Sequence, residues 1–240
     1  MITVRDVYDF LDQLAPFDQQ MEWDNSGLVL GSFAQEVRRA AVCLDIPGGL
    51  PEVDLIVSHH PVIFHARRQF TNPQEPAARL LRQGISAIAF HTNYDACPGG
   101  VNDILAARLC LKDVAILPCG VRIGTAQPTA VQDYAKFISV ALGAVTRYLE
   151  ETSHKIHRTA VCGGAGCAHL PEVYGKADAF VTGDAGHHDF LEAAQNGVSL
   201  FAAGHWHTEV VAMRPLLERL REAFPSVRWE YLDGGCEQVI

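Results

Sequence analysis

The chain has 240 residues, with 48% hydrophobic and 20% charged side chains, a balance typical of a globular protein with a substantial core. Its formal net charge of −9 disfavours nonspecific binding of nucleic acid, unless basic residues cluster locally. We expect a cytoplasmic protein without a membrane partner, because no segment reaches the roughly 18 apolar residues of a membrane span, no export signal is recognisable, and the seven cysteines form no CxxC pair.

The first half of the chain alternates predicted helices with short apolar strands. Residues 3–14 have apolar side chains at helical spacing behind Thr3, a residue type that caps helices. Further helices are expected at residues 75–83, before Gly84, and 101–109. Apolar runs bounded by turn residues predict strands at 37–44, 55–58 and 85–90. This order of elements predicts a mostly parallel sheet with right-handed crossovers.

The second half repeats the alternation after a break. Near residues 110–125 the rhythm loosens around Pro118, Gly120 and Gly124, and we place a lobe boundary there. Helices are then expected at 129–142, 188–196 and 209–223, and strands near 145–150, 157–162, 179–181, 198–203 and 228–232. The fold class is therefore α/β, with two interlinked lobes and mixed, mostly parallel sheets. The approximate lobes are residues 1–120 plus 200–240, and residues 121–199.

Residues of the kind that bind metals follow three of the predicted strands. His59 and His60 come directly after the strand at 55–58, and Pro61 prevents the strand from continuing. His91 and Asp95 follow the strand at 85–90. A third pair, His205 and Glu209, follows the strand at 198–203 and is spaced i, i+4 at a predicted helix start, which places both side chains on one face. In open α/β sheets, sites form at the carboxyl ends of strands.

These side chains could hold two divalent ions about 3.5–4 Å apart, as in two-metal hydrolytic sites. Imidazole and carboxylate ligands suit Zn, Mn, Fe, Co or Ni. Each cluster also has an ordinary structural interpretation. The two adjacent histidines can be a turn feature, His205 with Glu209 a helix-end pair, and Asp95 a brace for the turn before Pro98. Three clusters at strand ends together favour the metal interpretation.

Five short motifs occur in order over most of the chain. They are WDNSGL at 23–28, SHHP at 58–61, HTNYD at 91–95, TGD at 182–184 and GHWHTE at 204–209. This series resembles the signature of the Nif-three-like family, whose members are also named GTP cyclohydrolase 1 type 2 homologues. The resemblance implies a two-lobed α/β fold, a ring-like homohexamer and dinuclear metal sites that face its inner cavity. The chain is similar in length to the short form of the family, without the extra domain of longer members.

The resemblance also implies roles for single residues. His60 and Asp95 would bind one ion, His59 and His205 the other, and Glu209 would bridge the two. His91 resembles a family histidine that transfers a proton or supports a ligand, and a buried structural hydrogen bond is the alternative.

Other residues have two interpretations each. Asp45 can orient a ligand histidine or cap a turn, and His187 with His188 can line a cavity or form an exposed helix start. His207 lies between two expected ligands, where family members often have another residue. The loop GGAG at 163–166 has the composition of a phosphate cradle but lacks the full motif, and Arg67 with Arg68 can meet phosphate or lie in a solvated loop.

Two functions of different classes follow. The first is a metal-dependent hydrolase, in which a hydroxide bridging two ions attacks a nucleotide or phosphoester-type substrate. The family name suggests opening of the GTP purine ring. The second is a metal-binding scaffold or regulatory protein without turnover. The expected partners are a small-molecule or nucleotide substrate and further copies of the same chain.

Overall fold

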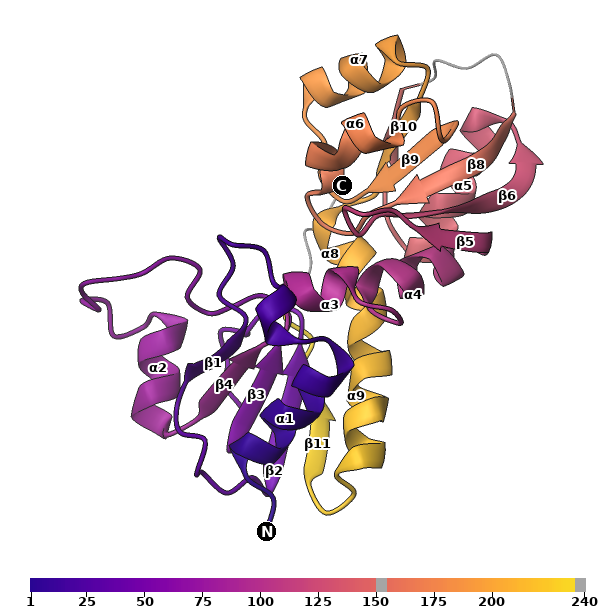
Figure 1. The fold of residues 1–240 in the computed structure, drawn as a ribbon. Coiled ribbons are helices and arrows are strands. Elements are labelled where there is room, and N and C mark those ends of the chain that lie inside the picture. Colours follow the sequence, from indigo (N-terminus) through magenta and orange to yellow (C-terminus); the bar gives the residue numbers. More distant parts are fainter. Residues whose placement is uncertain (150–154, 236–240) are drawn as a thin grey trace. The chain divides into compact units, whose positions relative to one another are not determined.

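The computed structural model describes residues 1–149 and 155–235, and the chain divides into two compact units (Figure 1). The first unit comprises Met1–Cys97 and Met213–Gly235, and the second unit comprises Pro98–Ala212. The first unit is therefore formed by two segments of the chain, and the second unit lies between them in the sequence. Both units are α/β with mixed sheets, so the predicted fold class is confirmed.

The first unit is built on a five-stranded sheet with strand order β1-β4-β3-β2-β11. Only β1 runs antiparallel to its neighbour, and the other pairs are parallel. In chain order its elements are α1 Val4–Leu14, a 3-10 turn Phe17–Gln19, β1 Gly27–Leu30, β2 Arg39–Cys43, β3 Leu55–Ser58, α2 Pro76–Gln83, β4 Ser86–Ala89, α3 Thr92–Ala96, α9 Met213–Ala223 and β11 Arg228–Tyr231.

Local chemistry explains where helices of the first unit begin and end. Thr3 caps α1 as predicted, because its hydroxyl accepts from the Asp6 N–H while the Asp6 carboxylate accepts from the Thr3 N–H. Helix α2 begins with Pro76 and ends at Gly84, which adopts the left-handed conformation with φ of 67°. Helix α2 packs beside β1 and β4, and α9 packs beside β2 and β11 (Figure 1).

The second unit is built on a six-stranded sheet with strand order β5-β6-β8-β9-β10-β7. The central pairs β8–β9 and β9–β10 are parallel and the outer pairs are antiparallel. In chain order its elements are α4 Val101–Arg108, β5 Lys112–Ile116, β6 Arg122–Thr129, α5 Val131–Leu142, β7 Arg147–Tyr148, β8 Ile156–Val161, a 3-10 turn η2 Gly166–His169, α6 Leu170–Val173, β9 Ala179–Thr182, α7 His187–Gln195, β10 Ser199–Ala202, α8 His205–Glu209, a 3-10 turn Val210–Ala212.

Both faces of the second sheet are covered, because alternate strand residues belong to different cores. Val181 and Phe201 pack with Ile138 of α5 in one core cluster. Phe180 and Leu200 belong to the other cluster, together with residues of α6 and α7. Strands buried on both faces read as continuous apolar runs, which is why this part of the sheet was predictable.

The division of the chain differs from the lobe boundaries expected near residues 120 and 200. Helix α4 packs on β6 and β8, and Leu105 lies in the same core as Phe201, so residues from 98 onward belong to the second unit. Strand β10 pairs with β9 and belongs to this unit too. The glycines and proline near residues 110–125 lie around a β5–β6 hairpin and not at a boundary.

In each unit, the register brings the carboxyl ends of neighbouring strands together. Cys43 of β2 and Ala89 of β4 both pair with Ser58 of β3. In the second unit Thr182 of β9 pairs with Ala202 of β10. The residues that follow these strands, including the candidate ligands, therefore leave each sheet at one edge. Within the described ranges, no helix is long and apolar enough to cross a membrane.

Candidate metal-binding groups

Three histidines converge at the carboxyl edge of the first sheet. His59 and His60 follow β3, and His91 follows β4. The ring centroid of His59 lies 5.1 Å from that of His60 and 5.1 Å from that of His91. One ring nitrogen from each can be chosen so that all three lie within 4.8 Å of one another. The structure therefore brings together the three histidines that the sequence placed at strand ends.

The Nδ1 atom of each of these histidines is hydrogen-bonded to an oxygen. His59 Nδ1 lies 2.9 Å from the carbonyl oxygen of Phe90, His60 Nδ1 2.7 Å from Asp45 Oδ1, and His91 Nδ1 2.8 Å from Asp24 Oδ1. A carbonyl or carboxylate oxygen accepts, so Nδ1 carries the proton and the lone pair of each neutral ring is on Nε2. Metal-binding histidines in proteins are oriented in this way.

Asp95 completes the group of the first unit. It lies on α3, one helical turn after His91, and its Oδ1 is 3.3 Å from His59 Nε2. Two ligand atoms bound about 2.0–2.1 Å from one ion at a tetrahedral angle are about 3.3 Å apart. This pair therefore has the spacing of two ligands of one ion. The expected pairing of His60 with Asp95 stays a prediction.

Asp24 was not singled out from the sequence. Its carboxylate is completely buried and accepts hydrogen bonds from His91 Nδ1 and from both the hydroxyl and the N–H of Thr92. Burial alone would raise the pKa of Asp24, but the hydrogen bonds from His91 and Thr92 hold it well below its ordinary value. Asp24 lies in the motif WDNSGL and so could have been found there, but its contact with His91, 67 residues away, is visible only in the fold.

His205 and Glu209 form the group of the second unit. They are the first and last residues of α8, and His205 Nε2 lies 3.2 Å from Glu209 Oε2, as the i, i+4 spacing predicted. His205 Nδ1 lies 2.6 Å from Asp184 Oδ2, in the loop after β9. Glu209 is buried, with only 3% of its surface exposed. This histidine is thus oriented like those of the first unit, and Asp184 is a second orienting carboxylate that sequence analysis did not assign.

The glycine loop after β8 packs against this pair. A Cβ at Gly164 would lie 2.1 Å from Glu209 Oε1 and 3.1 Å from His205 Nε2, and Gly164 has φ of 59°. The Gly164 N–H donates to Thr208 Oγ1, which lies on α8 between the two ligands. Gly164 therefore allows close backbone approach to Glu209, and a Cβ at Gly166 would lie 2.7 Å from Cys162 Cβ and from Thr182 Oγ1, so packing accounts for these glycines without a phosphate.

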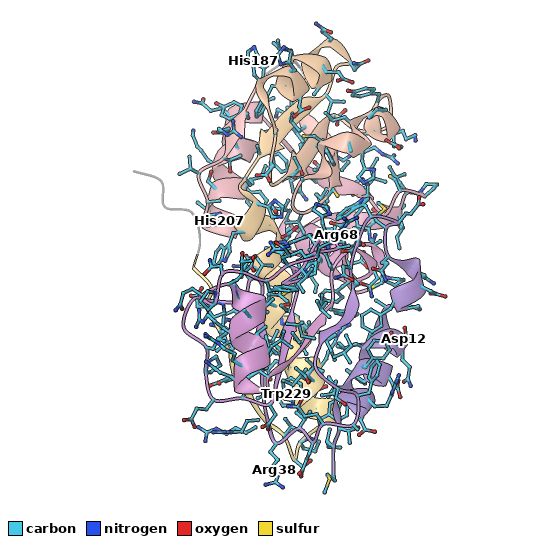
Figure 2. All side chains as sticks on the ribbon, turned by 90° about the vertical axis from the view of Figure 1, so that its left-hand side faces the viewer. Asp12, Arg38, Arg68, His187, His207 and Trp229 are labelled. Atoms are coloured by element: carbon cyan, nitrogen blue, oxygen red, sulfur yellow. The ribbon has the colours of Figure 1, made fainter. Side chains whose placement is uncertain are left out.

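Other residues considered from the sequence lie at exposed positions. His187 and His188 begin α7 and are exposed, as Figure 2 shows for His187. Arg68 lies in an exposed loop, and Arg67 in the same loop pairs with Glu75. Asp45 bonds to His60, so its orienting interpretation is supported.

The metal-free protein is expected to show a strongly basic His205. The hydrogen bond to Glu209, with a further contribution from Asp184, raises the pKa of His205 to about 9, although burial acts to lower it. Because the folded pKa lies above the ordinary value of about 6.5, the imidazolium stabilises the metal-free fold below pH 6.5, and this contribution is lost as the pH rises through 9. A metal ion must displace this proton, so apparent metal affinity should rise with pH up to about 9.

Nuclear magnetic resonance titration of the histidine side chains in chelator-treated protein measures this pKa. The Glu209→Gln variant should shift the midpoint of His205 back toward its ordinary value, because the largest stabilising contact of the imidazolium is neutralised. A wild-type midpoint near 6.5 would contradict the described geometry.

Comparison with known proteins places the chain in a family. Residues 2–233 match the Duf34/NIF3 (NGG1p interacting factor 3) family. The chain is 31% identical over 215 residues to a Campylobacter jejuni protein named GTP cyclohydrolase 1 type 2 homolog, covering 85% of this chain and 86% of the relative. It is 29% identical over 217 residues to a Helicobacter pylori protein named GTP cyclohydrolase 1 type 2, covering 87% and 88%.

Solved structures show the same fold. A Staphylococcus aureus protein superposes with a TM-score of 0.88 at 26% identity, covering 100% of this chain and 99% of that one. HcgD from Methanocaldococcus jannaschii, at 24% identity, superposes with a TM-score of 0.84 over 96% of this chain and 98% of its own. The chain therefore belongs to the Duf34/NIF3 family.

Proposed function

We propose that the protein is a hydrolase that uses two divalent metal ions. The ligands would be His59, His60, Asp95, His205 and Glu209, with Glu209 shared between the ions. The observation that carries the proposal is the orientation of the histidines: every candidate ligand histidine has its Nδ1 bonded to a carbonyl or carboxylate oxygen. This arrangement presents Nε2 as the coordinating atom.

The donor set fits such ions. The two imidazole–carboxylate pairs, His59 with Asp95 and His205 with Glu209, are spaced 3.3 and 3.2 Å apart, as ligands of one ion are. Imidazole with carboxylate and no thiolate suits Zn, Mn, Fe, Co or Ni. A pair of such ions held by these residues would supply a water of lowered pKa, near about 7, as the nucleophile for hydrolysis at a carbon or phosphorus atom.

His91 is the residue we propose to move the proton. Its ring lies 5.1 Å from that of His59 and 5.4 Å from that of His60, beside both expected ligands. Asp24 holds its Nδ1, so Nε2 is the atom that accepts or donates. The buried Asp24 carboxylate also fixes the orientation of the His91 ring for this transfer.

A flat substrate fits the surroundings of His91. The rings of Trp23 and Phe64 lie 5.8 Å from the His91 ring at 73° and 86°, and both side chains are exposed. Exposed aromatic rings beside a candidate catalytic group can stack on a heterocyclic base. Together with the names of the relatives, this favours a nucleotide, with GTP as the first candidate.

Trp23→Ala is therefore expected to raise KM for a nucleotide substrate while kcat changes little. Stacking of a base on an aromatic side chain contributes about 1–3 kcal/mol, which corresponds to a KM increase of about 5- to 150-fold. Steady-state kinetics with the metal-loaded protein measures both constants. Trp206→Phe is a suitable control on another element. An unchanged KM would argue that the substrate does not stack on Trp23.

The central experiment is a turnover assay. Purified protein is stripped with a chelator, reloaded separately with Zn, Mn, Fe or Co, and given GTP and a panel of phosphoesters. We expect hydrolysis of at least one substrate that requires metal. Absence of turnover with every metal, together with dissociation of an oligomer on chelation, would instead support the scaffold function. Measuring the size of the protein in solution before and after chelation also tests the predicted homohexamer.

Asp45→Asn is expected to weaken metal binding without unfolding the protein. The asparagine keeps the size of Asp45, which is half exposed, but removes the charge that orients His60. Loss of such an orienting carboxylate typically lowers metal affinity by about 10- to 100-fold. Competition titration with a chromophoric chelator gives the affinity, and Asp133→Asn, on an exposed face of α5, is the matched control. Equal affinities for the two variants would refute an orienting role for Asp45.

A further inference from the structure

A second group of potential metal ligands lies in the second unit, on elements other than those of the proposed dinuclear centre. One ligand atom from each of Cys119, His169 and Glu172 can be chosen so that all three lie within 4.8 Å of one another. Across residues 1–149 and 155–235, none of these three side chains takes part in a hydrogen bond or ion pair that would otherwise explain its position. Three unengaged donors of different chemistry thus converge at one place.

Rigid segments hold the three donors. Cys119 lies in the turn between β5 and β6, closed by hydrogen bonds from the Leu117 N–H to the Val121 carbonyl and from the Gly120 N–H to the Leu117 carbonyl. Within the same turn the Gly120 carbonyl also accepts from Asn102 Nδ2. The turn is therefore fixed on both sides of the cysteine.

The other two donors share one helical turn. His169 ends the 3-10 turn η2, and Glu172 lies three residues later in α6, so both side chains lie on one side of the segment. Leu170 and Val173 anchor this segment in the core, where they are 1% and 0% exposed. Cys119 and His169 are half-buried and Glu172 is exposed, which leaves the group accessible to an ion and to water.

The donor chemistry selects the ion. A thiolate, an imidazole and a carboxylate form a mixed soft and borderline set that favours Zn²⁺ among the common divalent ions and excludes Mg²⁺ and Ca²⁺. Zinc distances of about 2.0–2.3 Å require the ligand atoms to approach to about 3.3–3.8 Å, a closure of roughly 1 Å that rotations of partly exposed side chains can supply.

We propose that Cys119, His169 and Glu172 form a mononuclear zinc site, with water as the fourth ligand, that joins the β5–β6 turn to the η2–α6 segment. The ion would link positions 119 and 169, which are distant in the sequence, and would so stabilise the second unit. This site is separate from the proposed hydrolytic centre, whose expected ligands include no cysteine, and it does not depend on whether that centre works.

Cobalt substitution distinguishes the proposed zinc site from the proposed hydrolytic centre. The stripped full-length protein is titrated with Co²⁺, and the near-ultraviolet absorption from thiolate-to-cobalt charge transfer is recorded. Only a cysteine-ligated site produces this band, so the wild type should show it, with an intensity at saturation that corresponds to one thiolate-bound Co²⁺ per chain. Cys119→Ser should abolish the band and bind one equivalent fewer, while His169→Ala should weaken it by more than about tenfold in affinity.

Two controls make the result decisive. Cys167→Ser removes a neighbouring thiol that bonds to the Asp184 carbonyl, and it should keep the band at full strength. Glu209→Ala should keep the band as well, because Glu209 belongs to the other group. Circular dichroism confirms that each variant is folded. Absence of the band in the folded wild type, or its persistence in Cys119→Ser, would overturn the proposal.

Discussion

Replacing Glu209 with alanine is expected to remove the bound metals and to reduce turnover by at least about 10²-fold. Glu209 is buried beside His205, and in the proposed centre its carboxylate is shared by both ions. A single substitution would therefore affect both sites at once. Elemental analysis of the purified protein and the turnover assay with the best substrate measure the two effects.

The matched control for this variant is Glu192→Ala. Glu192 lies on α7 in the same unit and is exposed, with a hydrogen bond from the Tyr174 hydroxyl as its contact. Its loss should leave metal content and rate unchanged. If Glu209→Ala retains both metals and the wild-type rate, the proposed dinuclear hydrolase is refuted, whatever the substrate.

Replacing Asp103 with alanine is expected to destabilise the second unit by about 3–5 kcal/mol. Asp103 forms a two-point ion pair with Arg122, with Oδ1 2.5 Å from Nε and Oδ2 3.2 Å from Nη2. The Arg122 side chain is completely buried, so the variant would remove the Asp103 carboxylate that pairs with a charge in the interior. Urea denaturation, with amide hydrogen exchange in β6 and β8 to localise the effect, measures the loss.

Two further variants separate the ion pair from general effects of losing an aspartate. Asp133→Ala removes an exposed pair with Lys136 and should change stability by less than about 0.5 kcal/mol. The double variant Asp103→Ala, Arg122→Met removes the buried charge as well and should be more stable than Asp103→Ala alone. Equal stability of the single and double variants would show that the buried charge is not the cause.

The pH dependence of this ion pair has a defined sign. Burial alone would raise the pKa of Asp103, but the hydrogen bonds from Arg122 and from the Gly99 N–H lower it below the ordinary value. The pair therefore stabilises the fold above pH of about 4, and this contribution is lost as the pH falls through the lowered pKa.

The strand ends that carry the candidate ligands were predictable for a physical reason. Strands such as β3 and β10 are buried on both faces, so they appear as short apolar runs whose ends are sharply marked by His59 and His205. Parallel pairing then aligns those ends, and the i, i+4 spacing of His205 and Glu209 fixes their distance. The local sequence pattern and the strand topology were together sufficient to predict which strand ends carry the candidate ligands.

Strands β5 and β6 were not predicted, because they lack that pattern. All five residues of β5 are exposed, and its short apolar run, Val114–Ile116, follows the charged Lys112 and Asp113, so the sequence does not mark it as a buried strand. Strand β6 begins with the buried Arg122 and contains Gly124 and Pro128, residues that ordinarily indicate a turn or loop. The buried position of the charged Arg122 is explained by its ion pair with Asp103 and its hydrogen bond to the Gly120 carbonyl, partners that the sequence does not identify.

Two of the three orienting carboxylates, Asp24 and Asp184, were missed for a related reason. Asp24 and Asp184 contact His91 and His205 across 67 and 21 residues, so no spacing rule links them. The loop that contains Gly164 was interpreted from its composition alone. A glycine is required there because a Cβ would collide with the carboxylate of Glu209. Residues that support a ligand become recognisable only when the fold has brought the ligand to them.

The pairing of β11 with β2 has a consequence for synthesis on the ribosome. Arg39 pairs with Arg228, and the whole second unit is translated between them. At about 5–20 residues per second, the nascent first unit must wait on the order of ten seconds or more with β2 as an open edge. Such an edge attracts strands of other chains. Truncated products that end before Arg228 are therefore expected to aggregate, even when their second unit is complete.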